Sequence, residues 1–415
     1  MSIAICTSGN SREYQSILDE KNRHGRELIV ELNNLTYTVA EQHDHFYSFV
    51  GIRALTMVHL AIHDAFNAVE PEFETYAYHR KQPKANAHMA AVKATRTILL
   101  NIYPDRRDTI LQVCDRLIGI EPSSKPKQEG LALGDAIAKV YLELREGDGH
   151  EKQGDYTPMT KPGDYQYTPG WNNWVLKPDF SYARPFALDS VTQFRSPSPP
   201  SLSSEEYVQS FNEVKSYGMK KSTVRSKDQT EYAHWWAEFA EHSWNRIARI
   251  AAEARELSIH ETARLFALVN MNIYDIYLAS LESKYHYDTW RPFTAIRSAG
   301  QDGNSKTDPD RDWEPEMLTP PWPEYPSAHA AVGAGGAEIM AHVLGSPKFT
   351  FSMESTSCLA DARIRTYYDL NDAANECADS RIMNGYHFRF ATEEGKLQGR
   401  RIAQYIAATY LKPLE

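Results

Sequence analysis

Apolar residues recur at helical spacing along most of this chain, and this periodicity constrains the fold more than any other feature. From His45 to about Val69 they return every three or four positions, which predicts one long amphipathic helix. Further helices are expected at 87–102, 105–119, 128–146, 203–216, 228–254, 259–285, after His329, and from 371 to 412 with a break at Asn384-Gly385. The alternation typical of strands is almost absent. The sequence therefore predicts an all-α fold of two packed helix bundles.

The stretch from Gly147 to Pro200 interrupts this pattern, because it is rich in Gly, Pro, Tyr and Trp. Its aromatic side chains need a surface to pack against, so we expect an ordered crossover between two helical halves. A partly disordered linker is the alternative. We therefore divide the chain into an N-terminal half with the crossover, residues 1–200, and a C-terminal half, residues 201–415. Residues 1–40 are expected to form an arm or a small preliminary element.

The formal net charge of −10 over 415 residues bounds the partners of the chain. An acidic balance argues against nucleic acids and against a polybasic contact with a membrane surface. It also gives small anions no help from the overall field, so an anion site requires a strong local cluster of cations. No stretch approaches the length of a membrane span. A large apolar helical surface is compatible with a homodimer.

Four cysteines, Cys6, Cys114, Cys358 and Cys377, lie far apart and form no metal-binding pair. We expect reduced thiols in a cytoplasmic protein, with a Cys358–Cys377 disulfide as the alternative. The apolar start before Cys6 is too short for the core of a signal peptide. This favours a cytoplasmic location, and secretion stays open if a natural leader precedes the sequence.

Two histidines four residues apart, His59 and His63, lie in the first long predicted helix, followed by Asp64. A pair at this spacing can bind a metal, but neither HExxH nor a Cys/His cluster accompanies it. Packing and hydrogen bonding are therefore the expected role of both rings. Asp64 is a candidate for a supporting residue.

The segment Pro326-Ser327-Ala328-His329 predicts the start of a helix with Ser327 near the N-cap. The first turn of a helix has unpaired N–H groups and favours an anion. Ser327 adds a hydroxyl donor and His329 a titratable ring. A serine that only caps the helix is the alternative.

The same helix contains Gly333-Ala334-Gly335-Gly336. No strand precedes these glycines, so a nucleotide-binding loop is not expected. Small residues here are expected to let another helix approach closely.

A second stretch places Lys284 seven residues before Arg291, which is followed by Pro292. At about 100° per residue this spacing leaves both cations on nearly one helix face, and Pro292 disfavours a helical conformation at Arg291. Two long cationic side chains near a helix end can converge on an anion. The alternative is a solvated basic face.

A third stretch places Ser380-Arg381 six residues before His387. A continuous helix would leave Arg381 and His387 on different faces. The pair Asn384-Gly385 can break the helix and turn His387 inward. A histidine near a helix end is otherwise often a cap or a packed ring.

Taken in order, K-x6-R-P, P-S-x-H and S-R-x5-H form a three-part signature. The sequence here resembles the superfamily of vanadium-dependent haloperoxidases, bacterial acid phosphatases and type 2 phosphatidic acid phosphatases. Further segments are similar to the bacterial haloperoxidase branch: 53–65, 194–200, 290–297 and 323–330.

The resemblance implies a site that grips vanadate, or phosphate in its place. Lys284, Arg291 and Arg381 would neutralise the equatorial oxygens of that oxyanion. The Ser327 hydroxyl and the Ala328 N–H would donate hydrogen bonds to them. Guanidinium forks match the edges of such an anion, and fixed donors stabilise its charge better than water does.

The two histidines have different implied roles. His387 would be the axial ligand to vanadium, or the nucleophile toward a phosphate ester. His329 would be the acid/base residue on the opposite side, since a ring that titrates near neutral pH can move a proton there. Lys284 would also polarise the bound peroxide.

For a haloperoxidase, the implied partners are hydrogen peroxide, a halide and a small organic substrate that receives the halogen. The alternative activity is a soluble acid phosphatase acting through a phosphohistidine at the same site. A third hypothesis is a non-catalytic, helical anion-binding scaffold.

Two positions bear on these hypotheses. Ala328 stands where the family usually has glycine, so the N–H donor is kept but a methyl group crowds the anion. Trp322, seven residues before His329, either shapes access to the site or fills a core.

Overall fold

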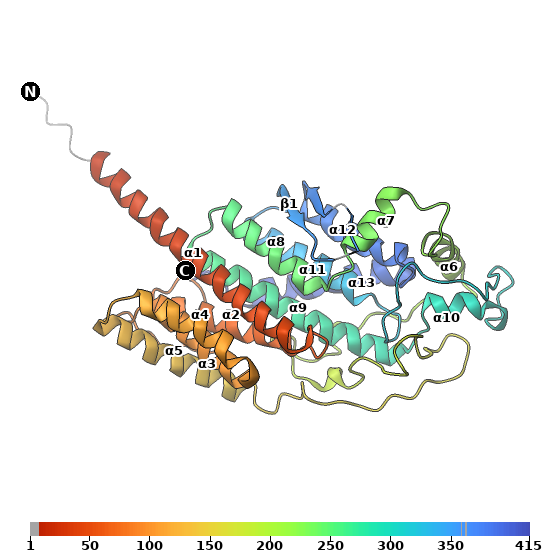
Figure 1. Cartoon of the computed structure of the whole chain (residues 1–415), viewed down its shortest axis with the longest axis horizontal. Helices are drawn as coiled ribbons and strands as arrows, with labels where there is room; N and C mark the ends of the chain where they lie inside the picture. The colour runs from red at the N-terminus through yellow and green to blue at the C-terminus, as the bar shows by residue number, and fades with distance from the viewer. Residues whose placement is uncertain (1–7, 358, 362) are drawn as a thin grey trace, which may run out of the picture. The chain divides into compact units, whose positions relative to one another are not determined.

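The computed structural model describes residues 8–415 apart from 358 and 362, and this part of the chain is mainly helical (Figure 1). The helices are α1 Ser8–Asp44, α2 Val50–Val69, α3 Ala87–Ile102, α4 Arg107–Ile120, α5 Lys125–Leu144, α6 Glu205–Tyr217, α7 Lys227–Trp235, α8 Ala240–Ala254, α9 Ile259–Tyr287, α10 Pro292–Arg297, α11 Ala328–Leu344, α12 Leu370–Met383 and α13 Arg389–Thr409. Two short strands, β1 Phe351–Glu354 and β2 Ile364–Tyr367, pair antiparallel as a hairpin. The predicted all-α fold is confirmed, with this hairpin as a small addition.

Two predicted elements differ from the structure. The arm or small preliminary element expected at 1–40 is, over its described part, one long helix α1, whose Ile29, Leu32 and Val39 are fully buried at helical spacing. The single helix expected at 228–254 is two helices, α7 and α8. The break follows Trp235 and Trp236, which are both fully buried. Adjacent side chains point about 100° apart on a continuous helix, so a break lets both enter the core.

The chain forms two compact units. The first takes residues up to 146 together with 248–267 and 410–415, and the second takes 147–247 and 268–409. The division into 1–200 and 201–415 stays a prediction, and the structure groups the crossover with the second unit.

In the first unit, α3 packs against α2 and α5. Asp64 on α2 is fully buried, and its carboxylate accepts the backbone N–H groups of Tyr76, Ala77 and Tyr78 and the hydroxyl of Tyr141. Burial raises the pKa of this carboxyl, and those four donors oppose the rise. Asp64 therefore holds the turn after α2 in place.

The two histidines of α2, like Asp64, contact polar groups of neighbouring segments. The ring of His59 contacts the Asn33 amide at 2.8 Å, and His63 contacts the Glu74 carbonyl at 3.0 Å. In the part of the chain that the structure describes, no group of three His, Cys, Asp or Glu side chains could hold a metal ion.

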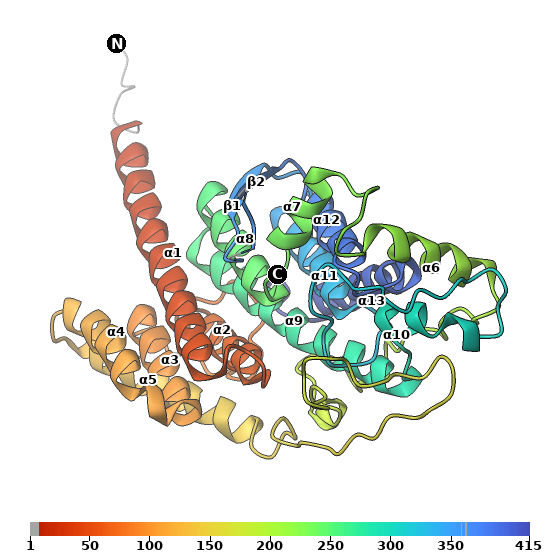
Figure 2. The ribbon, with the colours of Figure 1, turned by 45° about the vertical axis from the view of Figure 1, so that its right-hand side comes forward.

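In the second unit, α11 lies beside α12 and α13 (Figures 1 and 2). Glycines set the distance between α11 and its neighbours. A Cβ atom at Gly335 would lie 2.4 Å from Ile276 on α9 and 3.0 Å from the Gly399 carbonyl on α13. A Cβ atom at Gly395 would lie 2.4 Å from the carbonyl of Ser327. The close helix approach predicted from the small residues is confirmed.

The crossover packs on other segments of the second unit through backbone and side-chain hydrogen bonds. The N–H of Tyr165 donates to the Asp288 carbonyl at 2.7 Å, and the N–H of Leu176 donates to the Pro321 carbonyl at 2.9 Å. The indole of Trp171 donates to the Thr319 carbonyl at 2.9 Å. The aromatic-rich crossover thus contacts the two loops that follow α9 and precede α11.

Two remaining sequence expectations concern cysteines and membranes. Cys114 and Cys377 are buried free thiols, whereas Cys6 and Cys358 lie outside the described residues. None of the helices among the described residues has the length and apolar character needed to cross a bilayer.

Candidate functional site

The C-terminal end of α9 supplies the first cation of the site. Lys284 is fully buried, and its ammonium donates to the carbonyls of Pro323 at 2.9 Å and Glu324 at 2.8 Å. An ammonium has three N–H donors, so one is left for another acceptor.

Arg291 lies beyond α9, because that helix ends at Tyr287 and Asp288 takes a φ of 48°. Lys284 and Arg291 therefore do not share a helix face, contrary to the prediction from their spacing. Arg291 has an extended conformation, with φ −78° and ψ 156°, as expected before Pro292. The turn after α9 brings Arg291 to the loop before α11, residues 322–324, whose carbonyls also bind Lys284.

The guanidinium of Arg291 is held by three acceptors. Nε donates to the Trp322 carbonyl at 2.8 Å, and Nη1 lies 3.0 Å from the Tyr386 carbonyl and 3.1 Å from Nε2 of His387. Nη2 is buried and has no hydrogen-bond partner among the described residues. Arg291 is thus oriented with one donor left over.

The N-terminus of α11 carries the second motif. Ser327 is the N-cap, and its side chain accepts the N–H of Ala330. Ala328 is the first residue of the helix, where a backbone N–H has no partner within the helix. The Nε2 atom of His329 is buried and has no partner among the described residues.

The third motif spans the end of α12 and the turn before α13. Arg381 donates through Nη2 to the Trp236 carbonyl at 2.5 Å and through Nε to the Ser380 hydroxyl at 3.0 Å. α12 ends at Met383, and Gly385 has a φ of 78°, which breaks the helix where the sequence predicted. His387 follows this turn and is buried.

Glu324 is a member of the site that the motifs did not indicate. It is fully buried, and its Oε1 lies 2.8 Å from Nδ1 of His387 and accepts the N–H of Phe388 at 3.0 Å. Its Oε2 is buried without a partner among the described residues. The only signal in the sequence was a lone acidic residue between Pro323 and Tyr325, directly before the serine motif.

Burial is the largest influence on the protonation of these groups. It holds the pKa of Lys284 well below its usual range and lowers that of Arg291 to about 10. It also lowers the pKa of Arg381. Burial raises the pKa of Glu324 to about 7, against the charges of Arg291 and Lys284, which lower it.

Both histidines are kept neutral. Burial, followed by the charges of Arg291 and Lys284, holds the pKa of His387 well below its usual range. Burial and the charge of Arg381 do the same for His329, against a hydrogen bond to the backbone of Trp236.

The structure thus brings the predicted residues into one neighbourhood, which we call the cationic cage: Lys284, Arg291, Ser327, Ala328, His329, Arg381 and His387. The cage has three cationic side chains, and Glu324 is the carboxylate that faces Lys284 and Arg291. Buried charges are normally paired, so this balance favours a bound anion. The unpartnered Nη2 of Arg291 and Nε2 of His329 are suited to an oxyanion such as vanadate or phosphate.

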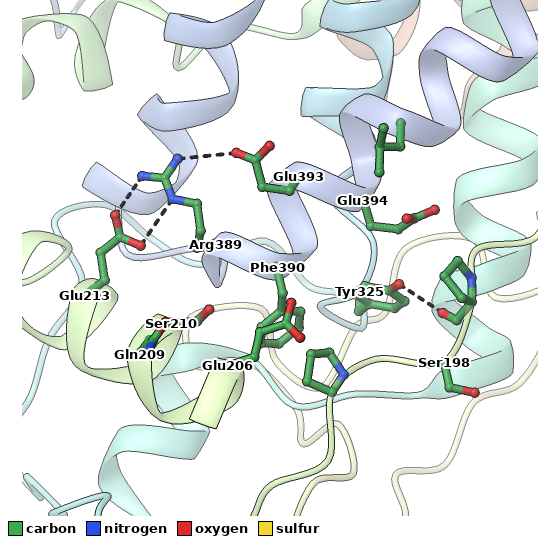
Figure 3. A pocket seen from close by; sticks show the side chains of 13 residues that line it. Ser198, Glu206, Gln209, Ser210, Glu213, Tyr325, Arg389, Phe390, Glu393 and Glu394 are labelled. Atoms are coloured by element: carbon green, nitrogen blue, oxygen red, sulfur yellow. Dashed lines mark hydrogen bonds and ion pairs between the residues drawn. The ribbon is translucent and has the colours of Figure 1, made fainter. Parts of the chain in front are cut away.

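A separate cavity of about 650 Å³ lies in the same unit (Figure 3). Tyr325 and Phe390 form part of its wall, and Arg389 pairs there with Glu213 and Glu393. No residue of the cationic cage lines this cavity. It therefore lies outside the cage.

Comparisons with known proteins identify relatives of this chain. Residues 264–415 match the family described as the VCPO second helical-bundle domain. This range contains all the residues of the cationic cage.

One curated relative is the vanadium chloroperoxidase of Curvularia inaequalis, which is 25% identical over 382 residues. The match covers 73% of this chain and 62% of that relative, so the chain spans less than two thirds of its length.

Two solved structures share the fold. A bacterial vanadium-dependent iodoperoxidase superposes with a TM-score of 0.81 at 23% identity, over 94% of this chain and 97% of the other. A bacterial vanadium-dependent chloroperoxidase in its holo form gives a TM-score of 0.70 at 17% identity, over 87% and 91%.

Proposed function

We propose that this chain is a vanadate-dependent haloperoxidase of the superfamily that its motifs resemble, the vanadium-dependent haloperoxidases and type 2 phosphatidic acid phosphatases. In this reaction hydrogen peroxide oxidises a halide to a hypohalous-acid equivalent, which then halogenates a small organic substrate. The observation that carries the proposal is the cationic cage, in which a neutral His387 ring faces Arg291 at 3.1 Å.

The cations would hold the vanadate oxygens. Lys284 and Arg291 are already fixed by backbone carbonyls, so each can keep its orientation and still offer a donor. Arg381, anchored on the Trp236 carbonyl, would neutralise a further oxygen. Donors that are oriented before binding stabilise charge without reorganisation, which is the main electrostatic advantage of an enclosed site.

The first turn of α11 would supply further hydrogen-bond donors to the vanadate. The Ser327 hydroxyl and the N–H of Ala328 would donate to the anion, helped by the positive end of the helix dipole. The methyl group of Ala328 adds bulk at this place without removing the donor.

The two histidines would have different roles, one in binding vanadium and the other in proton transfer. Nε2 of His387 would bind vanadium, because a neutral ring with its lone pair on Nε2 is the form that binds a metal, and Arg291 Nη1 would then give up its contact with this atom. His329 would accept and return a proton on the opposite side, since its Nε2 has no other partner and its low pKa keeps it neutral. Vanadate, when bound, supplies a Lewis acid that activates hydrogen peroxide toward the halide without changing its own oxidation state.

The test is a halogenation assay. We would load the purified protein with vanadate and measure halogenation of a phenolic dye with peroxide and iodide, bromide or chloride. Turnover that requires vanadate and is lost in His387→Ala is expected. No vanadate-dependent turnover with any of the three halides would overturn the proposal.

An acid phosphatase is the second candidate, because the lone pair of His387 Nε2 that would bind vanadium could equally attack phosphorus. Steady phosphate release from a generic ester, inhibited by vanadate and absent in His387→Ala, would favour it. A protein that binds vanadate but shows neither activity would be an anion-binding scaffold.

A further inference from the structure

We propose that Glu324 is a positioning residue that fixes His387 in the tautomer whose Nε2 carries the lone pair and faces the cationic cage. The inference rests on the proposed role of His387 as the ligand to vanadium. It assigns to Glu324 a task that none of the three sequence motifs contains.

The tautomer follows from the partners of the two ring nitrogens. A guanidinium can only donate, so the 3.1 Å contact between Arg291 Nη1 and His387 Nε2 requires the lone pair on Nε2. With the lone pair on Nε2, the ring proton lies on Nδ1. Nδ1–H then donates to Oε1 of Glu324 at 2.8 Å. Both contacts therefore require the same tautomer, with the proton on Nδ1 and the lone pair on Nε2.

Glu324 is itself held rigidly. Its backbone N–H donates to the Thr289 carbonyl at 2.9 Å, and its own carbonyl accepts from the Lys284 ammonium at 2.8 Å. Oε1 also accepts the N–H of Phe388, the residue after His387. One fully buried residue therefore orients both the lysine and the histidine of the cage.

Without this acceptor only the contact with Arg291 would favour this tautomer, and the opposite one would gain population. Its Nε2–H would point at the N–H of Arg291, and no lone pair would face the cage. The charge of Glu324 has a second effect, because a carboxylate on the far nitrogen raises the basicity of a ligating imidazole. Orientation and charge can be separated by mutation.

Three variants separate them. Glu324→Gln keeps an oxygen that can accept from Nδ1–H but removes the charge. Glu324→Ala removes both. Glu282→Gln is the matched control, because Glu282 is also a buried glutamate of this unit but pairs with Arg195.

The first readout is the tautomer of His387 in protein free of vanadate. Nitrogen-15 NMR of histidine-labelled protein distinguishes Nδ1–H from Nε2–H rings, and a His387→Gln spectrum identifies the signal. We expect Nδ1–H in the wild type, in Glu324→Gln and in Glu282→Gln. In Glu324→Ala we expect the signal to shift toward the Nε2–H form.

The second readout is the dissociation constant of vanadate, measured by equilibrium binding. Loss of a partner on the far nitrogen typically weakens metal affinity by about 10- to 100-fold, and we expect this loss in Glu324→Ala. Glu324→Gln should lie between that variant and the wild type, and Glu282→Gln should match the wild type.

The proposal is overturned if wild-type His387 is in the Nε2–H form, or if Glu324→Ala keeps both the tautomer and the affinity. Circular dichroism checks folding, and if Glu324→Ala does not fold, the wild-type spectrum and the affinity of Glu324→Gln decide. Failure of the haloperoxidase proposal is a different result, namely no halide oxidation by the vanadate-loaded wild type, and it leaves the tautomer measurement intact.

Discussion

The individual residues of the cage combine strong charge with deep burial. Lys284 and Arg291 are both essentially inaccessible, and both are fixed by carbonyls of the loop that precedes α11. Charged groups in such an environment interact strongly with an anion, because water does not screen them. The geometry of each donor should therefore matter as much as its charge.

Arg291→Lys tests this point. A lysine keeps the charge, but it lacks the planar guanidinium of arginine. Its single ammonium cannot contact the carbonyls of Trp322 and Tyr386 and the anion at the same time. We expect vanadate binding to weaken by about 2 kcal/mol, or roughly 30-fold. Calorimetric titration with vanadate measures the effect.

Arg297→Lys is its control, because Arg297 contacts the Trp313 carbonyl and the Phe293 ring outside the cage. An unchanged affinity in Arg291→Lys would show that charge alone suffices there.

The resemblance carried by the three motifs implied the cage residues, whereas the spacing of each motif alone also fitted a structural role. The sequence did not predict Glu324, because a single glutamate beside a proline carries no signal of burial or of its partner. The bond from His387 to this carboxylate joins positions 63 residues apart, which only the fold reveals.

The helices and turns determine how those residues meet. Helix positions were largely predictable, since periodicity and caps are local: α3 begins and ends at the predicted residues, with Asn86 as N-cap. The left-handed conformation of Asp288 just after α9 was not predictable, because its contacts with the crossover are distant in the sequence.

The contact between α11 and α13 yields a prediction at Gly395. A methyl group there would collide with the carbonyl of Ser327 and displace the first turn of α11. We expect Gly395→Ala to lose about 1 to 3 kcal/mol of unfolding free energy. We also expect its vanadate dissociation constant to rise about tenfold or more.

Gly119→Ala on α4 is the control, because no atom lies within 4 Å of the added Cβ. Its higher helix propensity should leave stability unchanged or raised by up to about 1 kcal/mol. Urea unfolding and vanadate titration of both variants give the comparison, and wild-type behaviour of Gly395→Ala would contradict the steric argument.

Asp288, at the turn after α9, yields a prediction about pH. Burial raises its pKa from 3.8 to about 6, and the Tyr156 hydroxyl bonded to it opposes the rise. A raised pKa means that the folded state favours the protonated form. Its contribution to stability is therefore fully present below pH 3.8 and is lost as the pH rises through about 6.

Asp288→Asn removes this titration while keeping a residue that tolerates the φ of 48°. We expect the unfolding free energy of the variant to decline less than that of the wild type between pH 4 and pH 6. Urea denaturation at several pH values measures the difference, and parallel pH profiles would refute the assignment.

At the scale of the whole molecule, every residue of the cage belongs to the second compact unit. The division of the chain into these units was not predictable from local patterns, because each unit combines segments distant in the sequence. The first unit takes residues 248–267 and 410–415 after the chain has already entered the second.

A core substitution in the first unit should therefore change stability without changing the site. Leu60 on α2 is fully buried, and Leu60→Ala is expected to cost about 2 to 5 kcal/mol of unfolding free energy. We expect its vanadate dissociation constant to equal that of the wild type at temperatures where the variant is folded. Thermal unfolding and calorimetric titration check the two halves of this prediction, and weakened binding by the folded variant would contradict it.

The absence of a side chain at Gly395 lets α13 approach the start of α11 closely. The start of α11 rests against bare backbone, so the placement of a serine hydroxyl and an imidazole depends on the absence of a side chain on another helix. A mutational scan of this protein should accordingly find intolerance at a position that bears no reactive group, and chemistry alone would not explain why.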